Sequence, residues 1–80
     1  MTTAIYIVRD TDTDAKIFAG DLVEICEFLI AEVSERDVYD AISLHHEYAS
    51  LRETGCSELE FAENVAATVL RGLSVERVTK

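Results

Sequence analysis

Three motifs with the spacing of a helix start divide most of this chain, and they constrain its fold more than any other feature. In each motif an oxygen-bearing side chain precedes an acidic one by three positions. The pairs are Asp21 with Glu24, Ser34 with Asp37, and Ser57 with Glu60. The first side chain of such a pair can accept a hydrogen bond from an unpaired backbone N–H, and a glutamate at the second position can reach back. The motifs therefore predict three successive helices.

Apolar residues at helical spacing support these helices. A helix is expected near 22–33, burying a stripe made of Leu22, Ile25, Cys26, Leu29 and Val33. A second helix is expected to begin at the Ser34 motif and to run to about Glu53, where Gly55 can end it by adopting a left-handed conformation. A third follows Ser57 and ends at Gly72, and its stripe is Leu59, Ala62, Val65, Ala66 and Val69.

The two ends of the chain have the composition of β-strands. Residues 4–9 are rich in β-branched and aromatic side chains, residues 10–14 favour a turn, and 16–19 can form a second short strand. Residues 73–78 can close the sheet against this hairpin. We therefore predict one α+β domain over residues 1–80, an N-terminal β-hairpin followed by three helices and a short C-terminal strand, with the helices on one face of a small antiparallel sheet. A helical domain with a β-hairpin attached is the alternative.

Composition excludes several classes of function. The 80 residues include 16 acids and 7 Lys or Arg, giving a formal charge of −9, which disfavours direct binding to nucleic acid or to an anionic membrane. The chain contains neither a long apolar run nor the basic start of a signal peptide. Its two cysteines make no disulfide framework, so a cytoplasmic location is expected. Because no nucleophile, phosphate-loop or dinucleotide motif is present, we expect no enzyme and no cofactor.

The negative charge is concentrated on the first two predicted helices, since residues 21–40 carry a net −6 and residues 41–60 a net −3. Glutamates of the first helix lie opposite its apolar stripe, and acids of the second helix do the same. Side by side, these faces would form an acidic partner-binding surface made of Glu24, Glu27, Glu32, Glu35, Asp40 and Glu47. A merely solvated, solubilising face is the alternative.

Phe28 lies off the apolar stripe, with Glu24 and Glu32 one turn away on either side. An aromatic residue among carboxylates can anchor an interface. Alternatively, the hairpin, another helix or a second copy covers it.

Other clusters give weaker indications of chemistry. Asp10, Asp12 and Asp14 have the alternating spacing of calcium ligands, but Ala15 replaces the glycine of such loops, so an Asp-rich turn is the simpler interpretation. Of two adjacent histidines, His45 is expected to pack near the apolar side of its helix and His46 to lie at the surface. Cys26 is expected in the core, and Cys56 lies just before a helix.

The run from Ile5 to Val8, the Asp-rich turn and the acidic helix from Asp21 to Glu35 resemble small proteins of phages and mobile elements. In size, acidity and lack of catalytic motifs the chain is similar to anti-CRISPR proteins. The resemblance implies a non-enzymatic inhibitor that binds a CRISPR–Cas complex. The acidic face independently suggests nucleic-acid mimicry, in which it competes for the basic groove of a nucleic-acid-binding protein. The alternatives are a small structural or oligomerisation module whose apolar helix faces pair with another copy to form a homodimer and, third, a calcium-binding hairpin.

Overall fold

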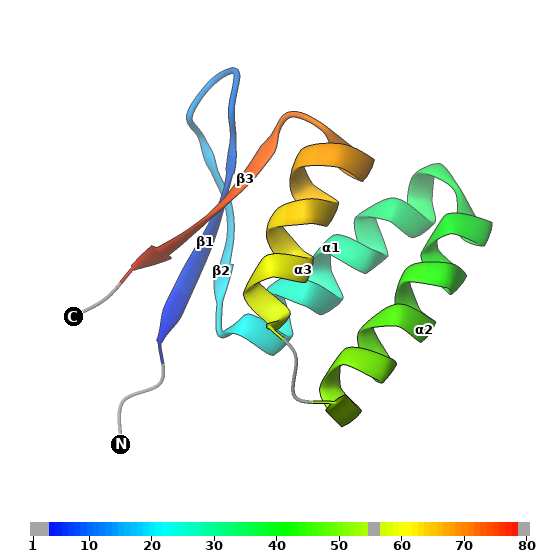
Figure 1. Cartoon of the computed structure of the whole chain (residues 1–80). Coiled ribbons are helices and arrows are strands. Elements are labelled where there is room, and N and C mark those ends of the chain that lie inside the picture. Colours follow the sequence, from blue (N-terminus) through cyan, green and yellow to red (C-terminus); the bar gives the residue numbers. More distant parts are fainter. Residues whose placement is uncertain (1–3, 55–56, 79–80) are drawn as a thin grey trace.

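The computed structural model describes residues 4–54 and 57–78, and Figure 1 shows their arrangement. Two strands, β1 (Ile5–Asp10) and β2 (Lys16–Gly20), are followed by three helical segments and a last strand. The helical segments are α1 (Leu22–Arg36), α2 (Val38–Thr54) and α3 (Glu58–Asn64), which continues into the π-helix η1 (Val65–Leu70). The last strand is β3 (Leu73–Val78). The predicted α+β fold, with an N-terminal hairpin and a C-terminal strand, is confirmed. Gly55 and Cys56 lie outside the described residues.

The three strands form an antiparallel sheet in the order β2-β1-β3, so β1 occupies the centre. Side chains alternate along β1, since Tyr6 and Val8 are buried beneath the helices while Ile5 is exposed on the other face. A register shift at Val8/Arg9 marks an irregularity in the β1–β2 ladder. Within the predicted turn, the carboxylate of Asp10 accepts hydrogen bonds from the backbone N–H groups of Asp12 and Thr13.

Helix α1 begins as its motif predicts. The Glu24 N–H donates to the Asp21 carboxylate at 2.9 Å, and the Asp21 N–H donates to the Glu24 carboxylate at 2.9 Å. The buried side chains are Ile25, Cys26, Leu29 and Val33. The predicted stripe is thus confirmed apart from Leu22, which is half-buried. Helix α1 extends to Arg36, beyond the predicted end near residue 33.

Asp37, not Ser34, begins the second helix, and the predicted cap at Ser34 is wrong. Ser34 lies within the last turn of α1, whereas Asp37 adopts an extended backbone, with φ −155° and ψ 105°. The Asp37 N–H closes α1 on the Val33 carbonyl at 2.8 Å, and its carboxylate accepts from the N–H of Tyr39 at 3.0 Å and of Asp40 at 3.3 Å. One residue therefore ends α1 and caps α2. The apolar stripe of α1 continues through Val33, which keeps Ser34 helical.

Ser57 caps α3 as predicted, accepting from the Glu60 N–H at 3.2 Å. The third predicted stripe is correct for Ala62, Val65 and Ala66 but wrong for Val69, because Leu70 is buried instead and Val69 is exposed. The wider turns of η1 cause this difference, since they shift the face that each later residue occupies. The segment ends at Arg71 and Gly72, with positive φ values of 54° and 88°.

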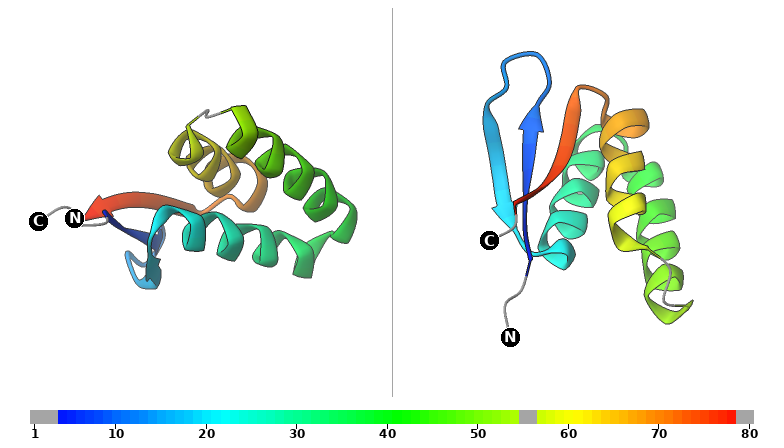
Figure 2. Two further views of the ribbon diagram at one scale, coloured as in Figure 1. Left: turned by 90° about the horizontal axis from the view of Figure 1, so that it is seen from below. Right: turned by 60° about the vertical axis from the view of Figure 1, so that its left-hand side comes forward.

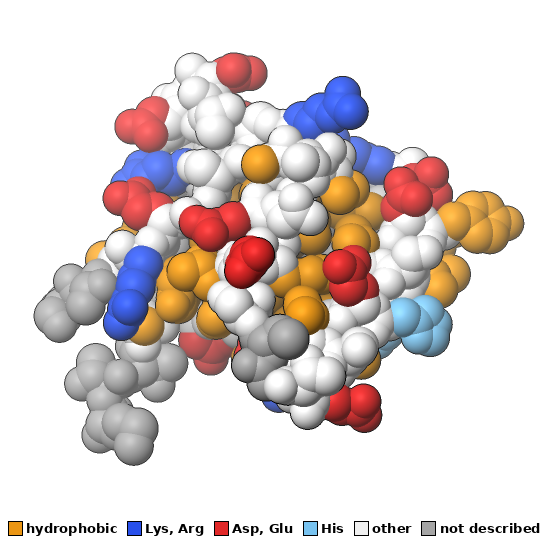
Figure 3. Space-filling view, in the orientation of Figure 1, with side chains coloured by type: hydrophobic (Ala, Val, Ile, Leu, Met, Phe, Trp, Pro, Cys, Tyr) orange, Lys and Arg blue, Asp and Glu red, His pale blue; other side chains and the backbone are white. Residues whose placement is uncertain are grey.

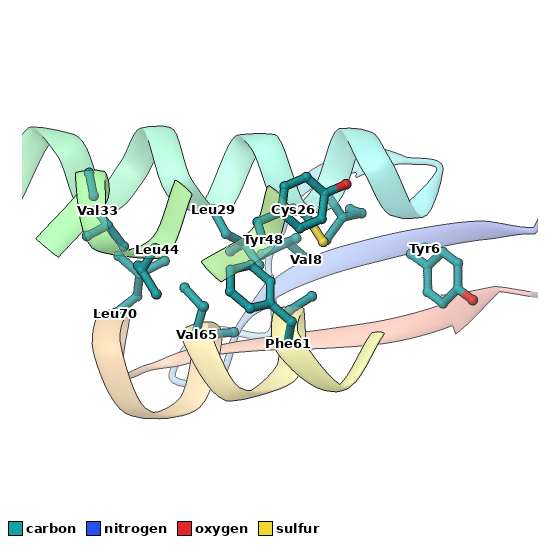
Figure 4. Close-up of a cluster of buried hydrophobic side chains, with 14 residues drawn as sticks. Tyr6, Val8, Cys26, Leu29, Val33, Leu44, Tyr48, Phe61, Val65 and Leu70 are labelled. Carbon is teal, nitrogen blue, oxygen red and sulfur yellow. The ribbon is translucent and has the colours of Figure 1, made fainter. Parts of the chain in front are cut away.

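The helices form two tiers on one face of the sheet (Figure 2). Segments α1, α3 and η1 pack against the strands, whereas α2 packs against α1 and α3 and contacts no described strand. The core lies between these elements, where Val8, Leu29 and Val65 are fully buried (Figure 4). No helix in the described part of the chain has both the length and the apolar character needed to cross a membrane. Because α2 contacts only α1 and α3 among the described elements, one side of this helix is left uncovered by them.

Candidate partner-binding surface

The formal charge of the chain is segregated between its two layers. Residues 21–71, which form the helical layer and its connections, include twelve acids and three arginines, a net −9. The remaining residues, 1–20 and 72–80, include four acids and four bases and are formally neutral. Figure 3 shows acidic side chains over both the helices and the hairpin of the face in view, with basic side chains beside them on the hairpin side. The whole excess of negative charge therefore belongs to the helical layer.

The three arginines of this layer are engaged elsewhere. Arg36 donates to the Leu70 carbonyl at 2.8 Å, Arg71 donates to the Thr68 carbonyl at 3.3 Å, and the Arg52 guanidinium lies 5.8 Å from the centre of the Tyr48 ring. Within the described ranges, both ion pairs involve Arg9, with Asp14 at 4.0 Å and with Glu76 at 3.0 Å. The carboxylates of α1 and α2 have no ion-pair partner among the described side chains.

The four glutamates predicted on α1 do not share one environment. Glu27 and Glu35 are exposed, but Glu32 is half-buried. Glu24 is exposed yet holds the Asp21 N–H in the capping box. Its carboxylate also lies so close to Gly20 that a Cβ there would be 2.8 Å from Oε1. Glu27 and Glu35 are thus the glutamates of α1 best placed to meet a partner without a role in folding.

Asp40 and Glu47, the acids predicted on α2, are exposed, but Glu47 does not extend the α1 face as predicted. Glu47 lines a hollow between α2 and α3 together with Glu60 and Asn64, whereas Glu27 lines a different groove, between α1 and α2. Asp40 lies in the first turn of α2, where a carboxylate stabilises the helix N-terminus. Negative charge therefore surrounds α2 on two sides.

Phe28 is half-buried against the core and stacks on Phe18 of β2, with ring centroids 4.5 Å apart and an interplanar angle of 6°. This is the arrangement expected if the hairpin covers Phe28. The ring fixes α1 against the sheet, and its edge is only partly accessible to a partner.

A groove between α1 and α2, with a volume of about 520 Å³, was not predicted from the sequence. Its walls are mainly apolar and include Ile30, Val38 and Ile42. His45 also lines it and is exposed, so the expectation that His45 packs against the core is wrong, whereas His46 is exposed as expected. The sequence did contain an indication of this groove, because Val38 and Ile42 lie off the buried stripe of α2, within the first five residues of that helix.

A cluster of Cys26, Tyr48 and Glu58 links α1, α2 and α3. The Tyr48 hydroxyl donates to the Glu58 carboxylate at 2.8 Å, and the Cys26 thiol donates to the Glu58 carbonyl at 3.6 Å. Burial, reinforced by the Glu58 carboxylate, raises the pKa of the Cys26 thiol to about 12. Burial and the hydrogen bond to Glu58 likewise raise the pKa of Tyr48. Figure 4 shows Cys26, Tyr48 and Phe61 together in the core, where a protonated thiol is a packing group, not a nucleophile.

The arrangement of the described side chains does not favour a metal site. The Asp10 carboxylate of the proposed calcium hairpin is turned onto its own backbone, as in an Asp-rich turn. Over residues 4–54 and 57–78, no group of three or more His, Cys, Asp or Glu side chains is arranged to hold a metal ion.

Comparison of the chain with protein-family models, with curated proteins and with solved structures gave no match.

Proposed function

We propose that this protein is a non-enzymatic inhibitor that binds the basic, nucleic-acid-binding surface of another protein through its acidic helical layer. The observation that carries the proposal is the unpaired charge of α1 and α2. Their described carboxylates have no ion-pair partner, while Arg36 and Arg52 are directed to a carbonyl and to an aromatic ring. Repulsion among these unpaired carboxylates opposes the folding of a small domain, and binding to a basic partner would relieve that repulsion.

The expected partner chemistry follows from the charge. A groove that binds phosphates offers Lys and Arg side chains, and carboxylates can occupy the same positions. Long-range attraction would then accelerate association, and salt would weaken it. A CRISPR–Cas complex is one partner of this class, in line with the resemblance to anti-CRISPR proteins.

Capture from a bacterial lysate, with elution by a rising salt gradient, tests the proposal. The Glu27→Lys/Glu35→Lys variant should lose a partner that the native protein retains, because these glutamates are exposed and lie outside the capping box. Glu60→Lys/Glu63→Lys is the matched control on α3. Each substitution adds two charges, so both variants carry −5 in place of −9. The proposal requires that the partner bind nucleic acid and that the native protein compete with that binding.

Equal capture by the native protein and by the α1 variant would contradict the role of α1. Equal loss in both variants would show that only overall charge matters.

Self-association is a second candidate, favoured by the face of the sheet that the helices leave uncovered. Exposed apolar side chains lie there, including Ile5 and Ile17 from neighbouring strands and Val78, which pairs with Ile5. The strand-forming ends of the chain are formally neutral, so two copies could meet with their acidic helices pointing apart. Sedimentation at micromolar concentration distinguishes this dimer from a monomer.

A further inference from the structure

The start of α2 holds the most exposed large apolar side chains in the described part of the chain. Tyr39 is 79% exposed, Val38 is 52% exposed and Ile42 is 50% exposed, whereas Ile17, on the open face of the sheet, is 44% exposed. Figure 3 shows hydrophobic side chains projecting beside a histidine at the right-hand edge of the molecule, where α2 lies. Exposed aromatic and branched side chains grouped in this way are typical of an interaction surface.

Val38 and Ile42 line the α1–α2 groove, whereas Tyr39 lies outside its lining. Residues from Val38 to Arg52 line one wall, and a separation of 14 positions along a helix is about 21 Å at 1.5 Å per residue. The opposite wall runs from Glu27 to Ser34 on α1. Both walls include small side chains, such as Ala31 and Ala49, that let another backbone approach closely.

The charge of the helices that form the groove determines which kind of molecule it can bind. Glu27 lines its α1 wall and Arg52 lines its α2 wall, but α1 and α2 together carry seven acids and two arginines, a net −5. A second copy of this chain would bring a helical layer of −9 against another of −9, which opposes self-pairing here. An apolar segment with Lys and Arg at its edges would bury the exposed side chains and also face these carboxylates.

We propose that the α1–α2 groove binds a single amphipathic helix of a partner protein, with apolar residues at helical spacing and basic residues along its flanks. This inference rests on the proposed function, since it names the segment of the basic partner that the protein recognises. The apolar side of that helix contacts Val38, Ile42 and Ala49, and its basic flank faces Glu27 of α1. Helix-in-groove recognition of this kind places apolar anchors one turn apart.

A synthetic helix tests the groove with the full-length protein. The probe is a peptide of about 14 residues made of Leu and Lys, with Leu at positions i, i+3, i+4 and i+7. We expect saturable binding, followed by the backbone amide NMR signals of the protein, with the largest shifts at Ile30, Ser34 and Ile42. Ile42→Asn should weaken binding about tenfold, equivalent to about 1.4 kcal/mol. The matched control, Ile17→Asn, should change binding by less than about twofold.

Two peptide controls test the chemistry of the occupant. A Leu/Glu peptide of the same pattern should bind much more weakly, because it faces like charge. A Leu/Lys peptide of the same composition in alternating order, which cannot form an apolar helical face, should also bind weakly. Equal binding of either peptide would overturn the proposal, as would a concentration-dependent dimer whose interface is the groove.

The outcomes also separate this inference from the proposed function. If the Leu/Lys helix binds elsewhere and is weakened by Glu27→Lys/Glu35→Lys but not by Ile42→Asn, the acidic layer remains the binding surface and the groove is rejected. If the groove binds the helix but the lysate experiment yields no nucleic-acid-binding partner, the inhibitor proposal fails alone. Ala49→Gln, which obstructs the same groove, replaces Ile42→Asn if the latter does not fold, and unchanged binding in it would overturn the groove.

Discussion

Removing the Asp37 carboxylate should destabilise the protein, because this one side chain caps α2. In Asp37→Ala the N–H groups of Tyr39 and Asp40 lose acceptors at 3.0 and 3.3 Å. Loss of an N-cap acceptor costs about 1 kcal/mol, with a range of about 0.5–2 kcal/mol. The value should not lie at the upper end, since these groups are exposed and water can replace the lost hydrogen bonds.

Ser34→Ala is the matched control, because its motif resembles a cap in the sequence but the residue lies inside α1. Alanine is the better helix former, and Ser34 is exposed. We therefore expect a change in the free energy of unfolding within about 0.5 kcal/mol.

Urea denaturation followed by circular dichroism measures both variants. With a slope of about 1 kcal/mol per molar urea, Asp37→Ala should lower the midpoint by about 1 M. In a thermal melt the same change should lower Tm by about 4–8 °C. An equal or larger loss in Ser34→Ala, or an unchanged midpoint in Asp37→Ala, would refute the assignment of the cap to Asp37.

Three further predictions concern the core and the turn before β3. The pKa of Cys26 is raised from its ordinary 9.0 to about 12, so its contribution to stability is complete below about pH 9 and is lost as the pH rises toward 12. Urea midpoints across that range should fall less steeply in Cys26→Ala, and an unchanged slope would contradict this. Phe28→Ala should lower the free energy of unfolding by about 2 kcal/mol, less than the loss of a fully buried phenylalanine. A double-mutant cycle with Phe18→Ala should give a coupling energy of about 0.5–1.5 kcal/mol, and simple additivity of the two losses would argue against the stack. Gly72→Ala should lower the free energy of unfolding by about 1 kcal/mol through backbone strain alone, since φ is +88° and no neighbour lies within 4 Å of the added Cβ. A thermal melt unchanged from that of the native protein would contradict this conformation.

Local sequence patterns were sufficient to predict most of the secondary structure. The Asp21 and Ser57 caps depend on contacts three residues apart, so their spacing alone predicted two helix starts. The β-branched and aromatic composition of residues 4–9 likewise predicted β1, and periodicity predicted the buried stripe of α1. Each of these features depends on neighbours in the sequence, which local patterns describe well.

Where two local signals competed, packing decided between them. Ser34 and Asp37 both have cap chemistry, and burial of Val33 keeps α1 helical past the first of them. The π-helix likewise exchanged Val69 for Leu70 in the core, although a regular helix would bury Val69. These outcomes depend on which residue best fills the space beneath neighbouring elements, and periodicity carries no information about that space.

The sequence by itself determined the charge of the protein, the order of its strands and helices, and the segment that carries the acids. Only the tertiary structure decided which surfaces those residues form. It stacked Phe28 on Phe18, separated Glu27 from Glu47 into different grooves, and left Val38, Tyr39 and Ile42 exposed at the start of α2. The physical reason is that a helical pattern specifies which residues share a face, while the docking of helices on one another determines which faces are covered.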